Sequence, residues 1–390
     1  MKRLATYLFV SIALGAPATA VAQVQDTLPA RPFVRGGVYD RPYLTRLLGR
    51  TVVGGYVEFH ARLQRVDGAN EDSGFEAKRW NIFTATEVSD FVRVSAELEF
   101  EEGGEEVKLE FAAIDFRIAP TFTIRGGMLL SPIGRFNLAH DSPLNEFTDR
   151  PLVSTEILGT ALSEPGLGVL GLFPVGSGGR ITYQVYAVNG FHAGLIEDSP
   201  DGTRIPLGRG NVEDNNASPA IVGRLAWSPS LNFELGISAH HGAYNVFEGD
   251  GLRVDERRDL TIGVVDLEAA LAGFRLTGEA ALANIDVPAT LRDIFASKQQ
   301  GLYVEVLRDF GQAWVATLPA SFFSVGVRLD IVDMNADRPG DNTRQVTLGI
   351  NFRPTEDTAF KLDYLRGTGR DVFNNPADHA GILFSIATYF

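Results

Sequence analysis

Cysteine is absent from the 390-residue sequence, so disulfides and cysteine-ligated metals are excluded. That absence suits an exported chain that crosses the periplasm unfolded. Basic residues are scarce relative to acidic ones, 35 against 49, which gives a formal charge of −14. Nucleic-acid binding depends on clustered Lys and Arg, so the composition argues against a nucleic-acid partner.

Long apolar runs are also lacking, apart from one short run near the start. Lys2 and Arg3 precede an apolar run from Leu4 to Gly15, and Ala20-Val21-Ala22 precedes Gln23. This pattern predicts a signal peptide over residues 1–22, with an uncleaved anchor as the alternative. The run is shorter than the roughly 20 residues that a membrane-spanning helix needs. A membrane location would therefore require a β-barrel, which we place at 54–390, after a periplasmic segment at 23–53.

What the chain does have is two-residue alternation. In residues 92–101, Val94 and Leu98 alternate with Arg93, Glu97 and Glu99, so one face is apolar and the other charged. A soluble sandwich would bury the apolar face, whereas a membrane barrel would turn it to lipid. The same pattern predicts sixteen strands, at 54–64, 77–88, 92–102, 106–118, 121–130, 164–175, 179–190, 219–229, 231–242, 259–272, 274–284, 300–308, 322–334, 343–353, 358–366 and 379–390. A change of apolar face at Ala112-Ala113 predicts a bulge.

The connections favour the barrel over the sandwich. After the first strand, long polar loops such as RVDGANEDSG alternate with short turns, as in outer-membrane barrels. Aromatic residues gather beside the short turns, as in an interfacial girdle. They are Phe91, Phe122, Phe173, Trp227, Phe233, Phe274, Phe310, Phe352, Phe360 and Phe390. The last stretch, HAGILFSIATYF, resembles the closing strand of Gram-negative barrel proteins, although Thr388 stands where a larger residue is usual.

The sequence thus predicts an all-β, transmembrane antiparallel barrel of about sixteen strands in the bacterial outer membrane. Its longest connection, 131–163, follows the fifth strand and is expected to fold inward as the third extracellular loop. A barrel of this size is too wide for side chains to fill, so such a loop would narrow it. A loop packed on the rim is the alternative. Candidate constriction residues are Arg135, Asn137, His140, Asp141, Glu146, Asp149 and Arg150.

Charged residues on the polar faces of the strands are candidates for the pore lining. We select Glu58, Arg62, Arg93, Glu97, Lys108, Arg125, Arg328, Asp330 and Arg353. Further carboxylates accompany them, including Glu99, Glu101, Glu110 and Asp363. Both signs are present, so the sequence leaves the sign of any ion selectivity open.

Three central stretches carry a family resemblance. GGMLLSPIGRFN at 126–137, DRPLVSTE at 149–156 and SEPGLGVLG at 163–171 resemble the bacterial porins of the phosphate-selective O/P type. The resemblance implies a sixteen-stranded, trimeric pore whose third extracellular loop bends into the lumen. Phosphate selectivity in that family rests on Arg and Lys lining the pore, and no such ladder can be placed in this sequence.

The leading functional prediction is a porin for passive diffusion of small hydrophilic solutes or ions, with anions such as phosphate as candidates. The alternative is a non-conducting barrel, an adhesin or scaffold, with a lumen plugged by residues 23–50. An enzyme at the barrel rim would need Asp/His or Ser/His groups held together. The one such pair close in sequence is His140-Asp141, and adjacent residues rarely form a working catalytic dyad, so an enzyme is disfavoured. No cofactor or metal is expected, since neighbours such as His240 and His241 point to opposite faces of a strand. Expected partners are outer-membrane lipid, lipopolysaccharide, the solute and two further copies of the chain.

Overall fold

The computed structural model describes residues 45–48 and 51–390. The predicted signal peptide and most of the predicted periplasmic segment lie outside these residues. Within them, β1 (Thr45–Leu48) pairs antiparallel with the first barrel strand. That strand begins at Thr51, slightly before the predicted start at residue 54.

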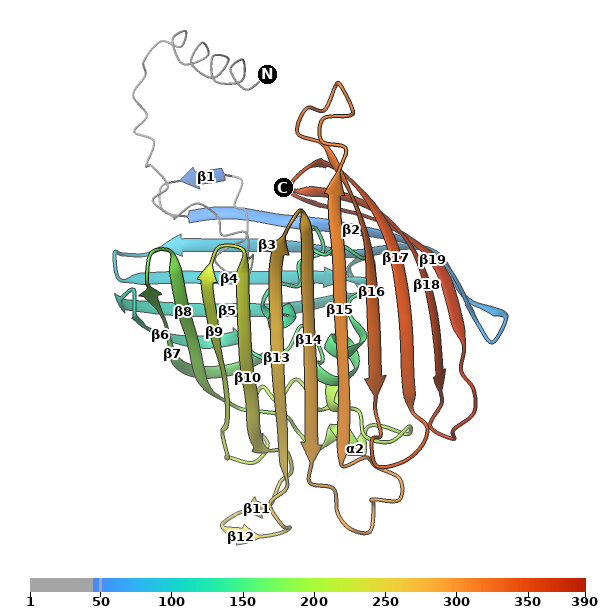
Figure 1. The fold of residues 1–390 in the computed structure, drawn as a ribbon. Coiled ribbons are helices and arrows are strands. Elements are labelled where there is room, and N and C mark those ends of the chain that lie inside the picture. Colours follow the sequence, from blue (N-terminus) through green and yellow to red (C-terminus); the bar gives the residue numbers. More distant parts are fainter. Residues whose placement is uncertain (1–44, 49–50) are drawn as a thin grey trace. The chain divides into compact units, whose positions relative to one another are not determined.

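Sixteen antiparallel strands form a closed barrel (Figure 1), which confirms the predicted fold class. Each strand pairs with its neighbours in sequence, and the last pairs with the first. All sixteen predicted strands are present, with boundaries shifted by at most four residues except at the start of the second strand, which lies eight residues before the predicted residue 77. They are β2 (Thr51–Val66), β3 (Ala69–Glu87), β4 (Val92–Glu101), β5 (Glu106–Ala119), β6 (Phe122–Leu130), β7 (Ser163–Val175), β8 (Gly179–Val188), β9 (Ala220–Ser230), β10 (Phe233–Ala243), β13 (Asp259–Leu271), β14 (Phe274–Ile285), β15 (Lys298–Phe310), β16 (Phe322–Asp333), β17 (Asn342–Thr355), β18 (Thr358–Arg370) and β19 (His379–Tyr389).

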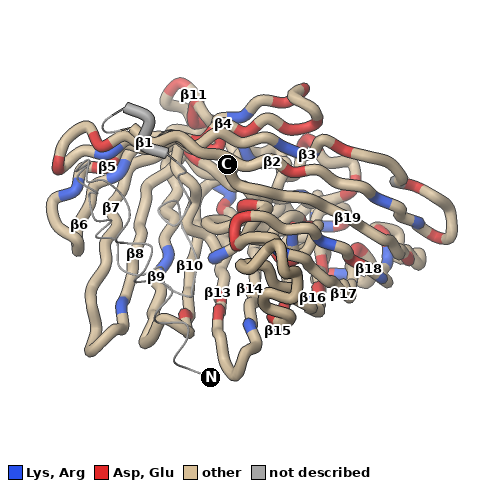
Figure 2. The backbone as a smooth tube through the Cα atoms, turned by 90° about the horizontal axis from the view of Figure 1, so that it is seen from above, with Lys and Arg blue, Asp and Glu red and all other residues tan. Residues whose placement is uncertain are grey.

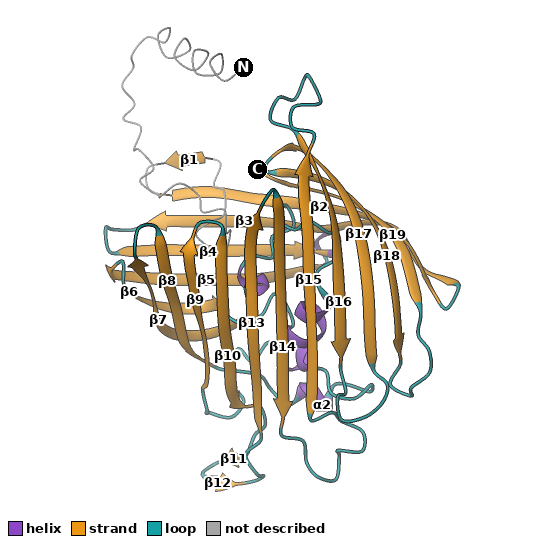
Figure 3. Cartoon of the chain, viewed as in Figure 1, coloured by secondary structure: helices purple, strands orange, loops and turns teal. Residues whose placement is uncertain are grey.

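The remaining elements lie in the connections. They are η2 (Glu102–Gly104), η3 (Phe136–Leu138), the π-helix η4 (Val153–Leu158), α2 (Gly194–Glu197), η5 (Ile205–Gly208) and the two-stranded ribbon of β11 (Glu248–Gly249) and β12 (Leu252–Arg253). Figure 3 shows these short helices against the strands. Within the described residues, no helix combines the length and apolarity that crossing a membrane needs.

The two faces of the barrel are the reverse of those in a soluble protein. On β16, Val325 and Leu329 are 48% and 40% exposed on the outer face. Arg328 and Asp330, on the inner face of the same strand, are 1% and 0% exposed. An apolar exterior over a polar interior is what a bilayer selects in a closed barrel. The fold therefore indicates the bacterial outer membrane.

Aromatic rings gather at the end of the barrel that carries the short turns. Phe310 stacks on Phe323 at 5.8 Å between ring centroids, Phe323 contacts Phe352 at 4.9 Å, and Phe352 contacts Phe360 at 6.2 Å. These four residues lie on consecutive strands from β15 to β18, so their rings form a continuous row. The row has the position of the aromatic girdle that the sequence predicts.

Two local predictions were wrong. The stretch RVDGANEDSG is a hairpin with a two-residue turn, in which Asp67 and Gly68 have φ values of 49° and 83°. Asp-Gly favours this turn because both residues tolerate positive φ, and the flanking polar residues continue the strand pairing. The bulge lies at Glu110, since Glu97 pairs with Phe111 and Leu98 with Leu109, whereas Ala112 and Ala113 pair regularly.

Candidate pore constriction

The segment between β6 and β7, residues 131–162, is mostly buried and makes hydrogen bonds with inward-facing strand residues such as Arg328, Lys361 and Asp363. Within this segment, Glu146 contacts three side chains of the barrel strands. Its carboxylate accepts hydrogen bonds from Arg275 of β14 at 2.5 Å and Asn351 of β17 at 3.0 Å, and lies 3.3 Å from Arg353. Burial would raise the pKa of Glu146, but the two guanidinium groups outweigh it and hold the pKa well below the ordinary value. Glu146 thus remains ionised and ties the segment to β14 and β17.

Asp149 provides a second ionic anchor, 2.7 Å from Arg62 of β2. The Asp149 carbonyl oxygen accepts a hydrogen bond from Arg328 of β16 at 2.7 Å. The Arg328 guanidinium also lies 5.1 Å from the centroid of the Phe147 ring, a cation–π contact. Phe147 is 1% exposed because it lies over Gly349 of β17, where a Cβ atom would be 2.9 Å from its ring. Gly349 therefore leaves space for this ring.

The earlier part of the segment is anchored on β13 and β14. Arg135 forms an ion pair with Glu268 of β13, and the Phe136 backbone N–H donates to Glu279 of β14 at 2.5 Å. Asn137 closes the base of the segment: its side chain donates to the Leu162 carbonyl at 3.0 Å and accepts from the Leu162 N–H at 2.8 Å. Asn137 is thus a structural residue that ties the two ends together.

His140 and Asp141 face different partners. The His140 Nε2 atom lies 3.1 Å from Glu110, the bulge residue of β5, and His140 is fully buried. Asp141 accepts a hydrogen bond from the Tyr389 hydroxyl at 2.9 Å. Arg150 donates to the Thr160 carbonyl at 3.1 Å, within the same segment. These contacts give both side chains of the His140-Asp141 pair a structural role.

Charges of both signs follow the strands around the ring (Figure 2). The candidate cations of the lining each have a carboxylate partner. Arg93 donates to Glu87 at 2.8 Å, and Arg125 makes a two-pronged contact with Asp115 at 2.6 and 2.9 Å. The others are Lys108 with Glu101 at 2.9 Å, Arg328 with Asp330 at 2.7 Å, Arg62 with Asp149 at 2.7 Å and Arg353 with Glu146 at 3.3 Å.

The candidate carboxylates of the lining also have hydrogen-bond partners. Glu58 accepts from Ser142 of the inner segment at 2.6 Å and contacts His60 at 2.7 Å. Glu97 accepts from Asn81 at 2.6 Å. We call the inward residues of β2–β5 and β16–β18, together with residues 137–150, the charged sector.

Sequence reasoning missed two members of the charged sector. Arg79 contacts Glu101 at 2.8 Å, and Lys361, fully buried, donates to the Ser142 carbonyl at 2.8 Å. Both were detectable, because Lys361 lies two residues before Asp363 on the same face of its predicted strand, and Arg79 lies in the predicted strand 77–88. The contacts of Lys361 with the inner segment were not detectable, since they join distant parts of the chain.

A second connection, between β8 and β9, packs against the inner segment, and sequence analysis did not predict this packing. Leu195 and Ile205, between β8 and β9, are fully buried and join the same cluster as Ile157 and Leu158 of η4. Arg209 of this connection donates to the Gly159 carbonyl oxygen at 2.5 Å. Inward apolar residues from the long-loop half of the strands complete the cluster, among them Tyr186, Val188, Val222, Ile262, Val264 and Ala283. We call this cluster the apolar sector.

Metal binding has no support in the described part of the chain. Among residues 45–48 and 51–390, no three His, Cys, Asp or Glu side chains are grouped so as to hold a metal ion. His240 points inward and contacts Glu164 at 3.1 Å, whereas His241 is exposed and contacts Thr261 at 2.9 Å. The two histidines thus point to opposite faces, as the alternation of β10 requires.

Comparison with known proteins supports the fold class. No family model matches the chain. An uncharacterised protein of Aquifex aeolicus is 27% identical over 358 residues, covering 85% of this chain and 79% of that protein. Among solved structures, the anion-selective porin from Comamonas acidovorans has a TM-score of 0.55 at 12% identity, covering 87% of this chain and 99% of that chain.

Two further solved structures agree. The outer-membrane channel DcaP of Acinetobacter baumannii has a TM-score of 0.54 at 12% identity, covering 87% of this chain and 97% of its own. OmpF of Salmonella typhi, in complex with daunomycin, has a TM-score of 0.53 at 13% identity, covering 87% and 98%. The chain therefore has the fold of outer-membrane porins and channels. At these identities the likeness shows the fold alone.

Proposed function

We propose that this protein is an outer-membrane porin through which small hydrophilic solutes and ions diffuse passively. The observation that carries the proposal is the closed sixteen-strand barrel with charged side chains of both signs on its inner face. The barrel satisfies its backbone hydrogen bonds internally, so it can sit in lipid. Polar side chains on the inner wall can replace part of the water around a passing solute.

In this proposal, the long connections face the cell exterior and residues 131–162 are the third extracellular loop, which sets the size limit. Residues 1–22 are the cleaved leader, and residues 23–50, which precede β2, lie at the periplasmic mouth. The mature protein assembles as a homotrimer, a form also named for OmpT of Vibrio cholerae, which has a TM-score of 0.53. No cofactor and no enzymatic reaction are part of the proposal.

Phosphate selectivity receives less support than passive diffusion. An anion pathway of the phosphate-selective type needs cations that are available to the permeating ion. Here the six candidate cations Arg62, Arg93, Lys108, Arg125, Arg328 and Arg353 are each paired with a carboxylate. Paired charges largely cancel at the distance of a passing ion. We therefore propose weak selectivity between anions and cations.

The test is electrical. The mature protein, folded in detergent, is inserted into a planar bilayer under a KCl gradient, and single-channel conductance and zero-current potential are recorded. Discrete steps with a small potential are expected. A large potential of the anion-selective sign, with current blocked by added phosphate, would contradict weak selectivity while leaving the pore intact. Correctly folded protein without current would refute the porin.

The apolar sector favours a second candidate, a barrel that does not conduct and acts through its long loops as an adhesin or scaffold. Two connections and the long-loop halves of several strands bury apolar side chains there, with Ile157, Leu195 and Leu260 fully buried. That packing removes part of the lumen from any solute path. Absence of conductance together with binding of a surface partner by the loops would favour this candidate.

A further inference from the structure

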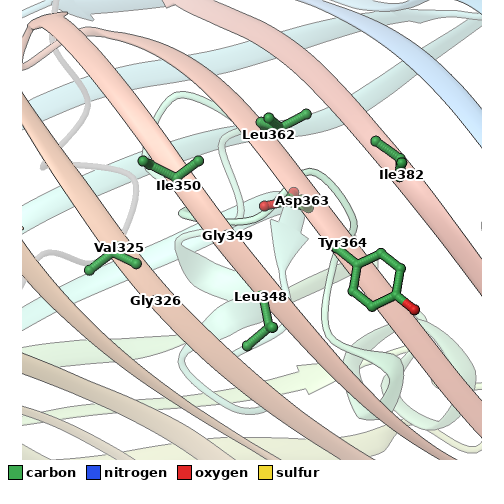
Figure 4. Close-up of a pocket in the computed structure, with 9 residues that line it drawn as sticks. All are labelled: Val325, Gly326, Leu348, Gly349, Ile350, Leu362, Asp363, Tyr364 and Ile382. Carbon is green, nitrogen blue, oxygen red and sulfur yellow. The ribbon is translucent and has the colours of Figure 1, made fainter.

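An apolar groove of about 450 Å³ lies on the outer face of the barrel, across β16 to β19. Figure 4 shows the side chains that border it. They come from four neighbouring strands: Val325, Leu348, Ile350, Leu362, Tyr364 and Ile382. Polar atoms contribute almost nothing to its surface, so water is a poor occupant and an apolar chain a good one.

Strand register places these residues in two rows across the sheet. Val327, Leu348, Tyr364 and Ile382 are paired in one row, and Val325, Ile350 and Leu362 in the next row towards the short turns. Below them lies the aromatic row of Phe323, Phe352 and Phe360. The groove thus occupies the apolar belt of the barrel, above the girdle.

Arginines stand directly beyond the groove, towards the long loops. Arg366 is in the row after Tyr364, paired through Ala380 with Arg65 of β2, and Arg344 is one row further along β17. All three are exposed on the outer face. At about 3.4 Å per residue, Arg366 lies roughly 7 Å beyond Tyr364 along the strand. Arg370 of β18 lies on the same outer face, one row beyond Arg344.

Unlike the lumen cations, these arginines form no ion pair with a carboxylate within the described residues. Arg65 donates to Asn70 at 3.0 Å, and Arg370 donates to the Asn374 carbonyl at 2.8 Å. Within the described residues, the side chains of Arg344 and Arg366 have no hydrogen bond or ion pair. Their position beside an apolar groove is complementary to an anionic headgroup above an acyl chain.

We propose that this groove and the arginines Arg344, Arg366 and Arg65 form a binding site for a phosphorylated lipid of the outer leaflet. One acyl chain lies in the groove between Leu348, Ile350, Leu362 and Tyr364, and a headgroup phosphate contacts Arg344 and Arg366. The ligand must carry both parts, because the groove offers no polar partner and the arginines offer no apolar one. The site rests on the proposed orientation, with long loops outside, and is independent of conduction through the lumen.

The test uses the mature protein folded in detergent and titrated with diphosphoryl lipid A, with bound lipid counted by native mass spectrometry. The double variant R344Q/R366Q should bind on the order of tenfold more weakly, since each arginine near an anionic lipid surface contributes to affinity. The matched control is R308Q, an exposed, outward arginine at the short-turn end of β15. Equal losses in the two variants would overturn the proposal.

The groove is tested separately. Ile350→Trp fills it, whereas Val304→Trp places the same bulk on the outer face of β15, away from the groove. We expect lipid binding to fall in the first variant only, with conductance unchanged in both. Unchanged lipid binding in Ile350→Trp would refute the acyl-chain site. A change in the number of chains per particle would assign the groove to a second copy of the protein and overturn the lipid proposal.

Discussion

The charged sector and the apolar sector hold the same loop segment by different forces. Residues 137–150 are fixed by ion pairs and hydrogen bonds such as Glu146 with Arg275 and Asp149 with Arg62. Residues 153–162 are fixed by apolar burial, with Val153, Ile157 and Leu158 fully buried. Electrostatic contacts depend on pH and on keeping both partners, whereas burial depends on volume and shape. Each half of the segment should therefore respond to a different perturbation.

The largest effect should follow from removing the central carboxylate of the charged sector. Glu146→Ala leaves the buried Arg353 without its carboxylate partner and the half-buried Arg275 with Asp309 alone. Loss of one member of a buried pair costs about 3–5 kcal/mol. We expect a lower free energy of unfolding in denaturant, and a larger, noisier single-channel conductance as the segment detaches. Glu156→Ala, an exposed carboxylate in the same segment, is the control. Equal stability of the two variants would contradict the anchoring role.

A somewhat smaller effect should come from the apolar sector. Ile157→Ala removes a fully buried side chain and should cost roughly 2–4 kcal/mol of unfolding free energy. Because no charge changes, the zero-current potential in a KCl gradient should stay at its original value. Val212→Ala, which shortens an exposed side chain between β8 and β9, is the control. A changed potential in Ile157→Ala would show that the two sectors are not separable.

Acid should affect the charged sector selectively. The pKa of Glu146 is lower in the folded protein than in the unfolded chain, so its contribution to stability is present above the unfolded value of about 4.3 and is lost as pH falls. Glu146→Gln should therefore differ most from the natural protein at neutral pH, and the difference should shrink in acid. Thermal unfolding of both proteins from pH 7 to pH 3 measures this. A difference that grows in acid would have the wrong sign.

The smallest stability effect should come from a partly exposed pair at the short-turn end. Arg93→Gln breaks the contact with Glu87, in which both side chains retain solvent contact, and should cost less than about 1 kcal/mol. The zero-current potential should nevertheless shift towards cation preference, because Glu87 keeps its charge. The reciprocal variant Glu87→Gln should shift it the other way. If the zero-current potential shifted in the same direction in both variants, Arg93 and Glu87 would not line the pore.

The sequence predicts the strands well because their alternation is local: each inward or outward position is set by its neighbours two residues away. It failed at residues 65–74, where polar residues continue the strands beyond the apolar belt and look like a loop. It also missed the connection between β8 and β9, whose Leu195 and Ile205 are too few and too irregularly spaced to give a periodic signal. Contacts such as Glu146 with Arg275 join residues 129 positions apart, so spacing could not identify them.

The seam between β19 and β2 has a consequence for how the chain is assembled. It joins the two ends of the barrel sequence, from His379 paired with Val66 to Tyr389 paired with Tyr56, and Phe390 donates its backbone N–H to Gly55 at 2.9 Å. Contacts so distant in sequence have the largest loop-closure cost and form late. Until the final residues dock, β2 and β18 each have an open edge, and such edges are not tolerated in lipid. Completion of the last strand is thus the step that commits the chain to the membrane.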